Sequence, residues 1–116
     1  MGLIEEVALL GADTDDALTR FMNNSALYER MLKKLPKLIE QAPVMPFMES
    51  GDLETAMSNA HTLKGVIGNL SITPLFNDYS EIVNLLRENK PDKAEELLRQ
   101  TFEIQQKFVD CIKKYE

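Results

Sequence analysis

The chain has 116 residues, of which 44% are hydrophobic and 28% charged, as is typical of one folded globular domain and not of a disordered chain. The formal net charge of −6 argues against nucleic acid as the main partner, because neutralising phosphates requires a basic face. No apolar stretch approaches the length of a membrane-spanning helix and no export signal is recognisable, so we expect a cytoplasmic protein with no membrane partner.

The first forty residues carry helical periodicity broken by turn residues. Residues 1–12 form an amphipathic segment, ended by Gly11, that we expect to cover one end of the fold; its apolar side chains are Leu3, Ile4, Val7 and Leu10. A brief helix follows through Phe21, capped by Asp13 or Thr14.

A longer helix is predicted from the Asn24–Ser25 cap to about Gln41, because Pro43 and Pro46 cannot continue it. Pro36 can kink this helix. Its predicted apolar stripe is Tyr28, Met31, Leu35 and Leu38. An irregular or helical piece then reaches Met48.

The next helix starts at the Asp52 cap and carries the only histidine, His61. Its apolar residues are spaced 3, 4, 3, 4 and 3 apart, which is a strict seam for packing against other helices; they are Leu53, Ala56, Ala60, Leu63, Ile67 and Leu70. Because His61 lies one residue, or 100°, away from this seam, we expect it on the flank of the helix and not in the core.

Two further helices are predicted to begin at prolines. Pro74, after Thr73, starts a helix with Leu75, Tyr79, Ile82 and Leu86 inside. Pro91 starts the last one, whose inner positions are Ala94, Leu97, Thr101, Ile104, Phe108, Cys111 and Tyr115. Four long stripes joined by short connections predict an all-α protein: an antiparallel up-down four-helix bundle over residues 13–116, preceded by a short N-terminal helix or helices.

The surface beside His61 is unusual for a helix. Its neighbours within about 60° around the helix axis are Met57, Ser58, Lys64, Gly65 and Gly68. Each glycine costs roughly 1 kcal/mol relative to alanine in a helix, yet together they remove side-chain bulk next to the imidazole. A lone helical histidine is most often an ordinary surface residue, but two glycines and a lysine beside it favour a nucleophile exposed to a large partner.

The chemistry open to this face is phosphoryl transfer without ATP. An exposed imidazole is mostly neutral at cytosolic pH, so one ring nitrogen can attack an acyl phosphate without a general base. Lys64, one turn further on, can neutralise charge on the transferring oxygens. No P-loop or glycine-rich nucleotide loop is present, so we expect a phosphocarrier and not an autonomous kinase.

Metal and cofactor chemistry have little support in the sequence. One histidine and one cysteine cannot make a zinc site of imidazole and thiolate ligands. Cys111 lies at an apolar position, so we expect a buried, free thiol. We therefore expect no metal or cofactor on this chain.

The run His61-Thr62-Leu63-Lys64-Gly65, followed by Gly68-Asn69, resembles the signature of histidine-containing phosphotransfer (HPt) domains. The resemblance extends from about residue 13 to the end and includes Ala17–Phe21, Tyr28–Arg30 and Glu49–Asp52. Val66 and Ile67 are bulkier than the small residues common in this family after the Lys-Gly pair, which can narrow the choice of docking partner. The Pro43/Pro46 segment is also unusual for the family's second helix.

The resemblance implies a role for each residue of the histidine face. His61 would take a phosphoryl group from an aspartyl phosphate on a response-regulator receiver domain and pass it to a second receiver. Lys64 would be the cation on the phosphate side, while Gly65 and Gly68, together with Met57 and Ser58, would form the docking surface. Magnesium would belong to the receiver, and a sensor or hybrid histidine kinase would be the other partner.

Two other hypotheses remain open. In a histidine kinase core the phosphorylated histidine sits in a dimerising hairpin and is commonly followed by an acidic residue, whereas here Thr62 and Leu63 follow. The four apolar stripes can also close into a bundle within one chain, which favours a monomer. An HPt-like bundle that only binds proteins would keep the fold without needing a histidine at position 61. Whether the chain is free-standing or a module of a larger kinase, and which kinase and regulator it serves, stays open.

Overall fold

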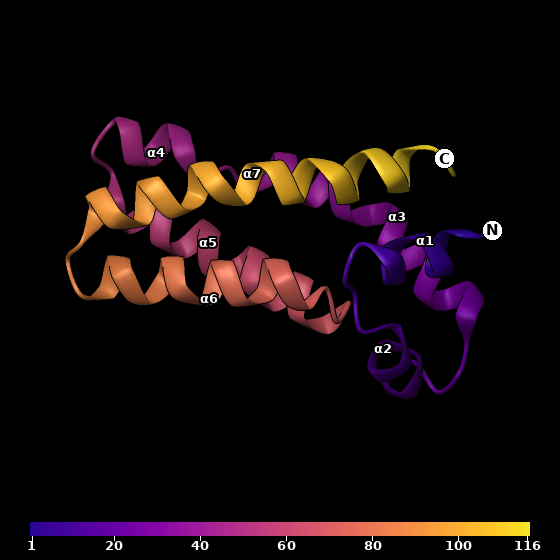
Figure 1. Ribbon diagram of the computed structural model, residues 1–116. Coiled ribbons are helices and arrows are strands. Elements are labelled where there is room, and N and C mark those ends of the chain that lie inside the picture. Colours follow the sequence, from indigo (N-terminus) through magenta and orange to yellow (C-terminus); the bar gives the residue numbers. More distant parts are fainter.

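A computed structural model describes all residues 1–116 and contains seven helices and no strand (Figure 1). The helices are α1 (Leu3–Leu9), α2 (Thr14–Arg20), α3 (Ser25–Gln41), α4 (Met45–Glu49), α5 (Leu53–Asn69), α6 (Thr73–Arg87) and α7 (Pro91–Lys113). The all-α class predicted from the periodicity is confirmed. No helix combines the length and the apolar character needed to cross a membrane.

The four long helices α3, α5, α6 and α7 form an antiparallel bundle (Figure 1). Each packs against two of the others, in the order α3, α5, α6, α7 and back to α3. The bundle is elongated, with the whole molecule measuring 41 × 24 × 21 Å. This arrangement confirms the predicted up-down topology with short N-terminal helices.

The seam of α5 is buried almost as predicted. Ala56, Ala60, Leu63, Ile67 and Leu70 are fully or nearly fully buried, while the first position, Leu53, is only partly covered. Because the 3-4 alternation keeps all of these side chains on one side, the opposite flank of α5 is left to solvent.

In α3 the predicted stripe is partly wrong. Leu32 is buried where Met31 was expected, and Leu38 is only half-buried while Pro36 lies in the core. The actual stripe advances in steps of 4, 3 and 4 from Tyr28, through Leu32, Leu35 and the half-buried Ile39. Both stripes fit a helical period, so only packing against α5 and α7 could decide between them.

The helix boundaries follow local signals with one exception. Asp13, Asn24 and Asp52 each accept a backbone N–H three residues ahead, and α3 ends at Gln41 as expected. The exception is α6, which has Ile72 and not Thr73 at its N-cap and begins one residue earlier than predicted.

The inner faces of α6 and α7 also differ in part from the predicted stripes. Val83 is buried in α6, and Leu98 and Ile112 are buried in α7, whereas Leu86, Leu97, Ile104 and Tyr115 are only half-buried. Cys111 is a buried free thiol, as expected.

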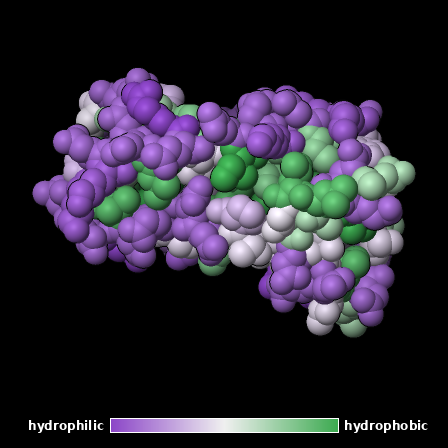
Figure 2. All heavy atoms as spheres, in the orientation of Figure 1, coloured by the Kyte–Doolittle hydropathy of each residue, from purple (hydrophilic) through white to green (hydrophobic).

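The N-terminal segment covers one end of the bundle, as predicted. In α1, Leu3 and Val7 are buried against a surface that includes α7 and α3. The C-terminal residues hold this helix in place, because Lys114 pairs with Glu6 at 2.7 Å and the Tyr115 hydroxyl donates to the Met1 carbonyl at 2.9 Å. Figure 2 shows a mostly hydrophilic face on which apolar side chains gather around α1 and beside α7.

Candidate functional site

His61 projects from the flank of α5 into solvent. The residue is exposed, and its ring has no hydrogen-bond or ion-pair partner in the structure. The seam one residue away is buried, so α5 is held firmly beneath it while the imidazole itself stays free. The prediction that His61 lies outside the core is confirmed.

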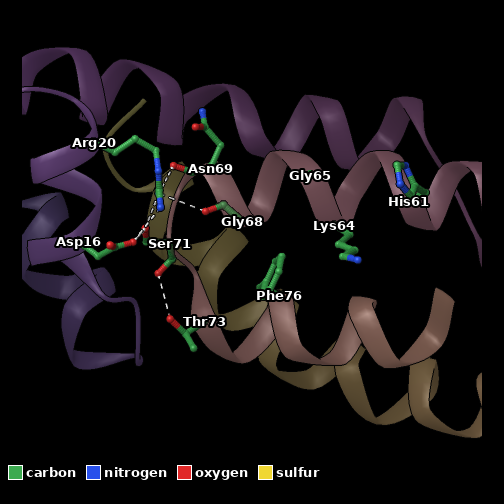
Figure 3. A pocket seen from close by; sticks show the side chains of 10 residues that line it. All are labelled: Asp16, Arg20, His61, Lys64, Gly65, Gly68, Asn69, Ser71, Thr73 and Phe76. Atoms are coloured by element: carbon green, nitrogen blue, oxygen red, sulfur yellow. Dashed lines mark hydrogen bonds and ion pairs between the residues drawn. The ribbon is translucent and has the colours of Figure 1, made fainter. Parts of the chain in front are cut away.

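The imidazole lies at the rim of an open hollow of about 540 Å³, which we call the histidine hollow. Residues of α2, α5, α6 and the turn between α5 and α6 line it (Figure 3). They are Asp16, Arg20, His61, Lys64, Gly65, Gly68, Asn69, Ser71, Thr73 and Phe76. A polar hollow of this kind, with a free imidazole at its rim and a lysine beside it, can receive an anionic group.

Lys64 shares the histidine hollow with His61 and is half-buried. Its ammonium has no carboxylate partner among the ion pairs of the structure. Instead, Nζ lies 6.0 Å from the centroid of the Phe76 ring on α6, which is within the range of a cation–π contact. The ammonium therefore lies beside an aromatic ring and is not neutralised by a carboxylate.

The two glycines beside His61 have different surroundings. A Cβ built on Gly65 would meet no atom within 4 Å, so this glycine leaves open surface next to the imidazole. A Cβ on Gly68 would lie 2.8 Å from both Cδ1 and Cε1 of Phe76. The expectation that both glycines make room for a partner needs correction, because the space at Gly68 is already filled by an aromatic ring of the same chain.

Met57 and Ser58 lie on the other side of His61. They line a second, smaller hollow of about 340 Å³ that also includes Glu54, Thr62, Val83 and Arg87. Ser58 is exposed and Met57 half-buried, while the Thr62 hydroxyl donates to the Ser58 carbonyl at 3.1 Å. His61 therefore stands between two hollows, and only the larger one contains Lys64 and the glycines.

A cluster of three residues that the sequence analysis did not assign closes the far end of the histidine hollow. Arg20 of α2 donates from Nη1 to the Gly68 and Asn69 carbonyls at 3.3 and 3.0 Å and to the Ser71 hydroxyl at 2.7 Å. Asp16 accepts from Arg20 at 2.9 Å and from the Ser71 hydroxyl at 2.7 Å. The last carbonyls of α5 thus receive a cationic cap, which suits the negative end of the helix dipole.

The electrostatics of this cluster favour an ionised carboxylate. The Ser71 hydrogen bond is the largest influence on Asp16, and together with the charge and hydrogen bond of Arg20 it holds the pKa of this carboxyl below its usual value, although desolvation acts in the opposite direction. In the sequence only the i, i+4 spacing of Asp16 and Arg20 was visible, and their partners lie about fifty residues away. The sequence pattern also gave no indication of Phe76, because its contacts with Lys64 and Gly68 exist only once α6 packs against α5.

No group of three or more histidine, cysteine, aspartate or glutamate side chains comes together in a way that could hold a metal ion. Around His61 the chemistry is that of one nucleophilic nitrogen and one nearby cation.

Residues 22–112 match the family model described as "Hpt domain". The match begins in the turn before α3 and runs almost to the end of α7, so it contains the bundle and His61. No curated protein and no solved structure matches the chain.

Proposed function

The chain belongs to the Hpt domain family, whose members carry phosphoryl groups on histidine in phosphorelays, and we propose that His61 is the residue that carries the group here. The observation that supports this assignment is the free, exposed imidazole at the rim of the histidine hollow. It is the only histidine in the chain.

In the proposed reaction the donor is an aspartyl phosphate on a receiver domain. The lone pair of an exposed His61 ring nitrogen attacks the phosphorus, a P–N bond forms, and the P–O bond to the aspartate breaks. The leaving aspartate carboxylate takes the bonding electrons, and the other ring nitrogen keeps its proton. The reverse steps, with the aspartate of a second receiver as nucleophile, discharge His61.

The neighbours of His61 have distinct proposed roles. Lys64 stabilises negative charge on the equatorial oxygens during transfer, because its ammonium lies in the same hollow and has no carboxylate partner. Gly65 allows the receiver to approach, since no atom occupies the space where its side chain would be. Met57 and Ser58, on the other side of His61, would contact the docked receiver.

The proposed partners are the domains that would supply the phosphoryl group. With no nucleotide loop in these 116 residues, the proposed source of the phosphoryl group is a separate receiver domain, itself charged by a sensor or hybrid histidine kinase. The receiver would supply the magnesium ion. The four long helices close around one core, so we propose that the chain works as a monomer.

The proposal is tested by incubating the protein with a receiver domain that carries a labelled aspartyl phosphate. We expect label to move to the wild-type protein and not to His61→Gln, while circular dichroism shows equal helix content in both. Equal labelling of the two proteins would refute the assignment. Binding of the receiver by both proteins without any transfer of label would instead identify a module that only binds proteins.

A further inference from the structure

We propose that Phe76 is a positioning residue that holds the Lys64 ammonium inside the histidine hollow, an inference that rests on the proposed function of His61 and Lys64. Phe76 is the only hydrophobic residue lining the hollow. It comes from α6, whereas His61 and Lys64 are both on α5. The packing of two helices therefore places a flat aromatic face beside the phosphate-side cation (Figure 3).

The Phe76 ring is wedged against α5. It fills the space left by the missing side chain of Gly68, with two ring carbons 2.8 Å from where a Cβ would be. The backbone of Phe76 is also fixed, since its N–H donates to the Ile72 carbonyl at 2.9 Å and its carbonyl accepts from the Ser80 hydroxyl at 2.7 Å. The half-buried ring is therefore positioned both by the backbone of α6 and by the surface of α5 that it fills.

No ion pair in the structure restrains the ammonium of Lys64. Its side chain has four carbon atoms and freely rotatable bonds, and a solvated ammonium on such a stem samples many positions. The nearest restraint is the ring face, with Nζ 6.0 Å from its centroid. The negative face of the ring attracts the ammonium and limits where it can go.

An aromatic ring suits this role better than a carboxylate would. A carboxylate would neutralise the ammonium and compete with the phosphoryl oxygens for it. The face of an aromatic ring carries no net charge and cannot take a proton from the ammonium. The ammonium therefore keeps its full charge, and its N–H groups remain free to donate to the phosphoryl oxygens. In this interpretation the absence of a side chain at Gly68 makes room for the Phe76 ring, which in turn positions the Lys64 ammonium.

A double-mutant cycle separates positioning from a merely structural effect. The rate of transfer from a phosphorylated receiver is measured for wild type, Phe76→Leu, Lys64→Ala and the double variant. A cation–π contact at a partly exposed site corresponds to roughly a 2–5-fold change, so Phe76→Leu should slow transfer by that factor. In the Lys64→Ala background the same substitution should have no effect, and Phe76→Tyr should retain the wild-type rate.

An unchanged rate in Phe76→Leu, or an equal slowing with and without Lys64, would overturn the inference. A second measurement does not depend on transfer or on the folding of any variant. In the NMR spectrum of the wild-type protein, the protons on the carbon next to Nζ of Lys64 should be shifted upfield by the ring. Absence of that shift would also overturn the inference, whereas a wild-type protein that shows the shift but takes no label would refute the proposed function instead.

Discussion

At the level of single residues, the two charged or nucleophilic groups of the histidine hollow differ in their freedom to move: the His61 imidazole is free and the Lys64 ammonium is restrained. The His61 ring has no partner and is open to an incoming phosphoryl group, whereas the Lys64 ammonium lies against the Phe76 ring. A nucleophile gains from exposure, but an electrostatic stabiliser gains from being already in place when charge develops. The two residues therefore have the environments that their proposed roles require.

Lys64→Ala should slow phosphoryl transfer by about tenfold, since it removes one charge-assisted contact to the transferring oxygens from a partly exposed site. The free energy of unfolding should hardly change, because Lys64 is not part of the core. Rapid-quench transfer assays measure the first effect and urea denaturation the second. Lys107→Ala, which removes an exposed lysine from α7, is the matched control; if both variants transfer at the wild-type rate, Lys64 has no role in the reaction.

Gly65→Ala should be more stable than Gly68→Ala. Both gain helix propensity, worth up to about 1 kcal/mol each. Only the Cβ at position 68 meets the Phe76 ring, so the free energy of unfolding of Gly68→Ala should lie below that of Gly65→Ala by about 1–3 kcal/mol. Chemical denaturation of the two variants in parallel measures this difference, and equal stabilities would show that the ring moves aside without cost.

At the level of elements, α2 packs against α1 and α3 and is joined to the end of α5 by a cluster of hydrogen bonds. Arg20 and Asp16 bind the last carbonyls of α5 and the Ser71 hydroxyl. Ser71 closes the helix with a φ of 55°, and the following N–H of Ile72 donates to the Ile67 carbonyl at 3.2 Å. One cluster thus ends the histidine helix, anchors α2 and forms a wall of the histidine hollow.

This anchor should depend on pH. The pKa of Asp16 is lower in the folded protein than in the unfolded chain, so ionised Asp16 stabilises the fold above the ordinary pKa of aspartate, about 4. The stabilisation is lost as the pH falls through the lowered pKa. Asp16→Asn should be less stable than wild type at pH 7, and the difference should shrink below pH 4. Urea denaturation from pH 7 to pH 3 measures it; a difference that does not vary with pH would contradict the role of this charge.

At the level of the whole molecule, the termini are held together at one end of the bundle. Leu3 and Val7 of α1 are buried, and the contacts of Lys114 and Tyr115 with the first residues fix α1 beside the end of α7. The matched family region starts at residue 22, so α1 and α2 lie outside it. They extend the core at the end of the bundle toward which α5 runs, beyond the histidine hollow.

Leu3→Ala should lower the free energy of unfolding by about 2–5 kcal/mol, because it leaves a cavity in a fully packed position. Leu9→Ala on the same helix is the control: Leu9 is 74% exposed, so its loss should change stability by no more than about 0.5 kcal/mol. Thermal or urea denaturation distinguishes the two. Similar stabilities would mean that α1 is not part of the cooperative unit.

The sequence by itself determined the helical class, the four long helices, most caps and the exposed position of His61, because these depend on local periodicity and on side chains within four residues of one another. Only the tertiary structure decided that Leu32 and not Met31 enters the core, that Phe76 fills the space at Gly68, and that Arg20 caps α5. Each of these depends on contacts between side chains of different helices, and no local pattern encodes how two helices meet.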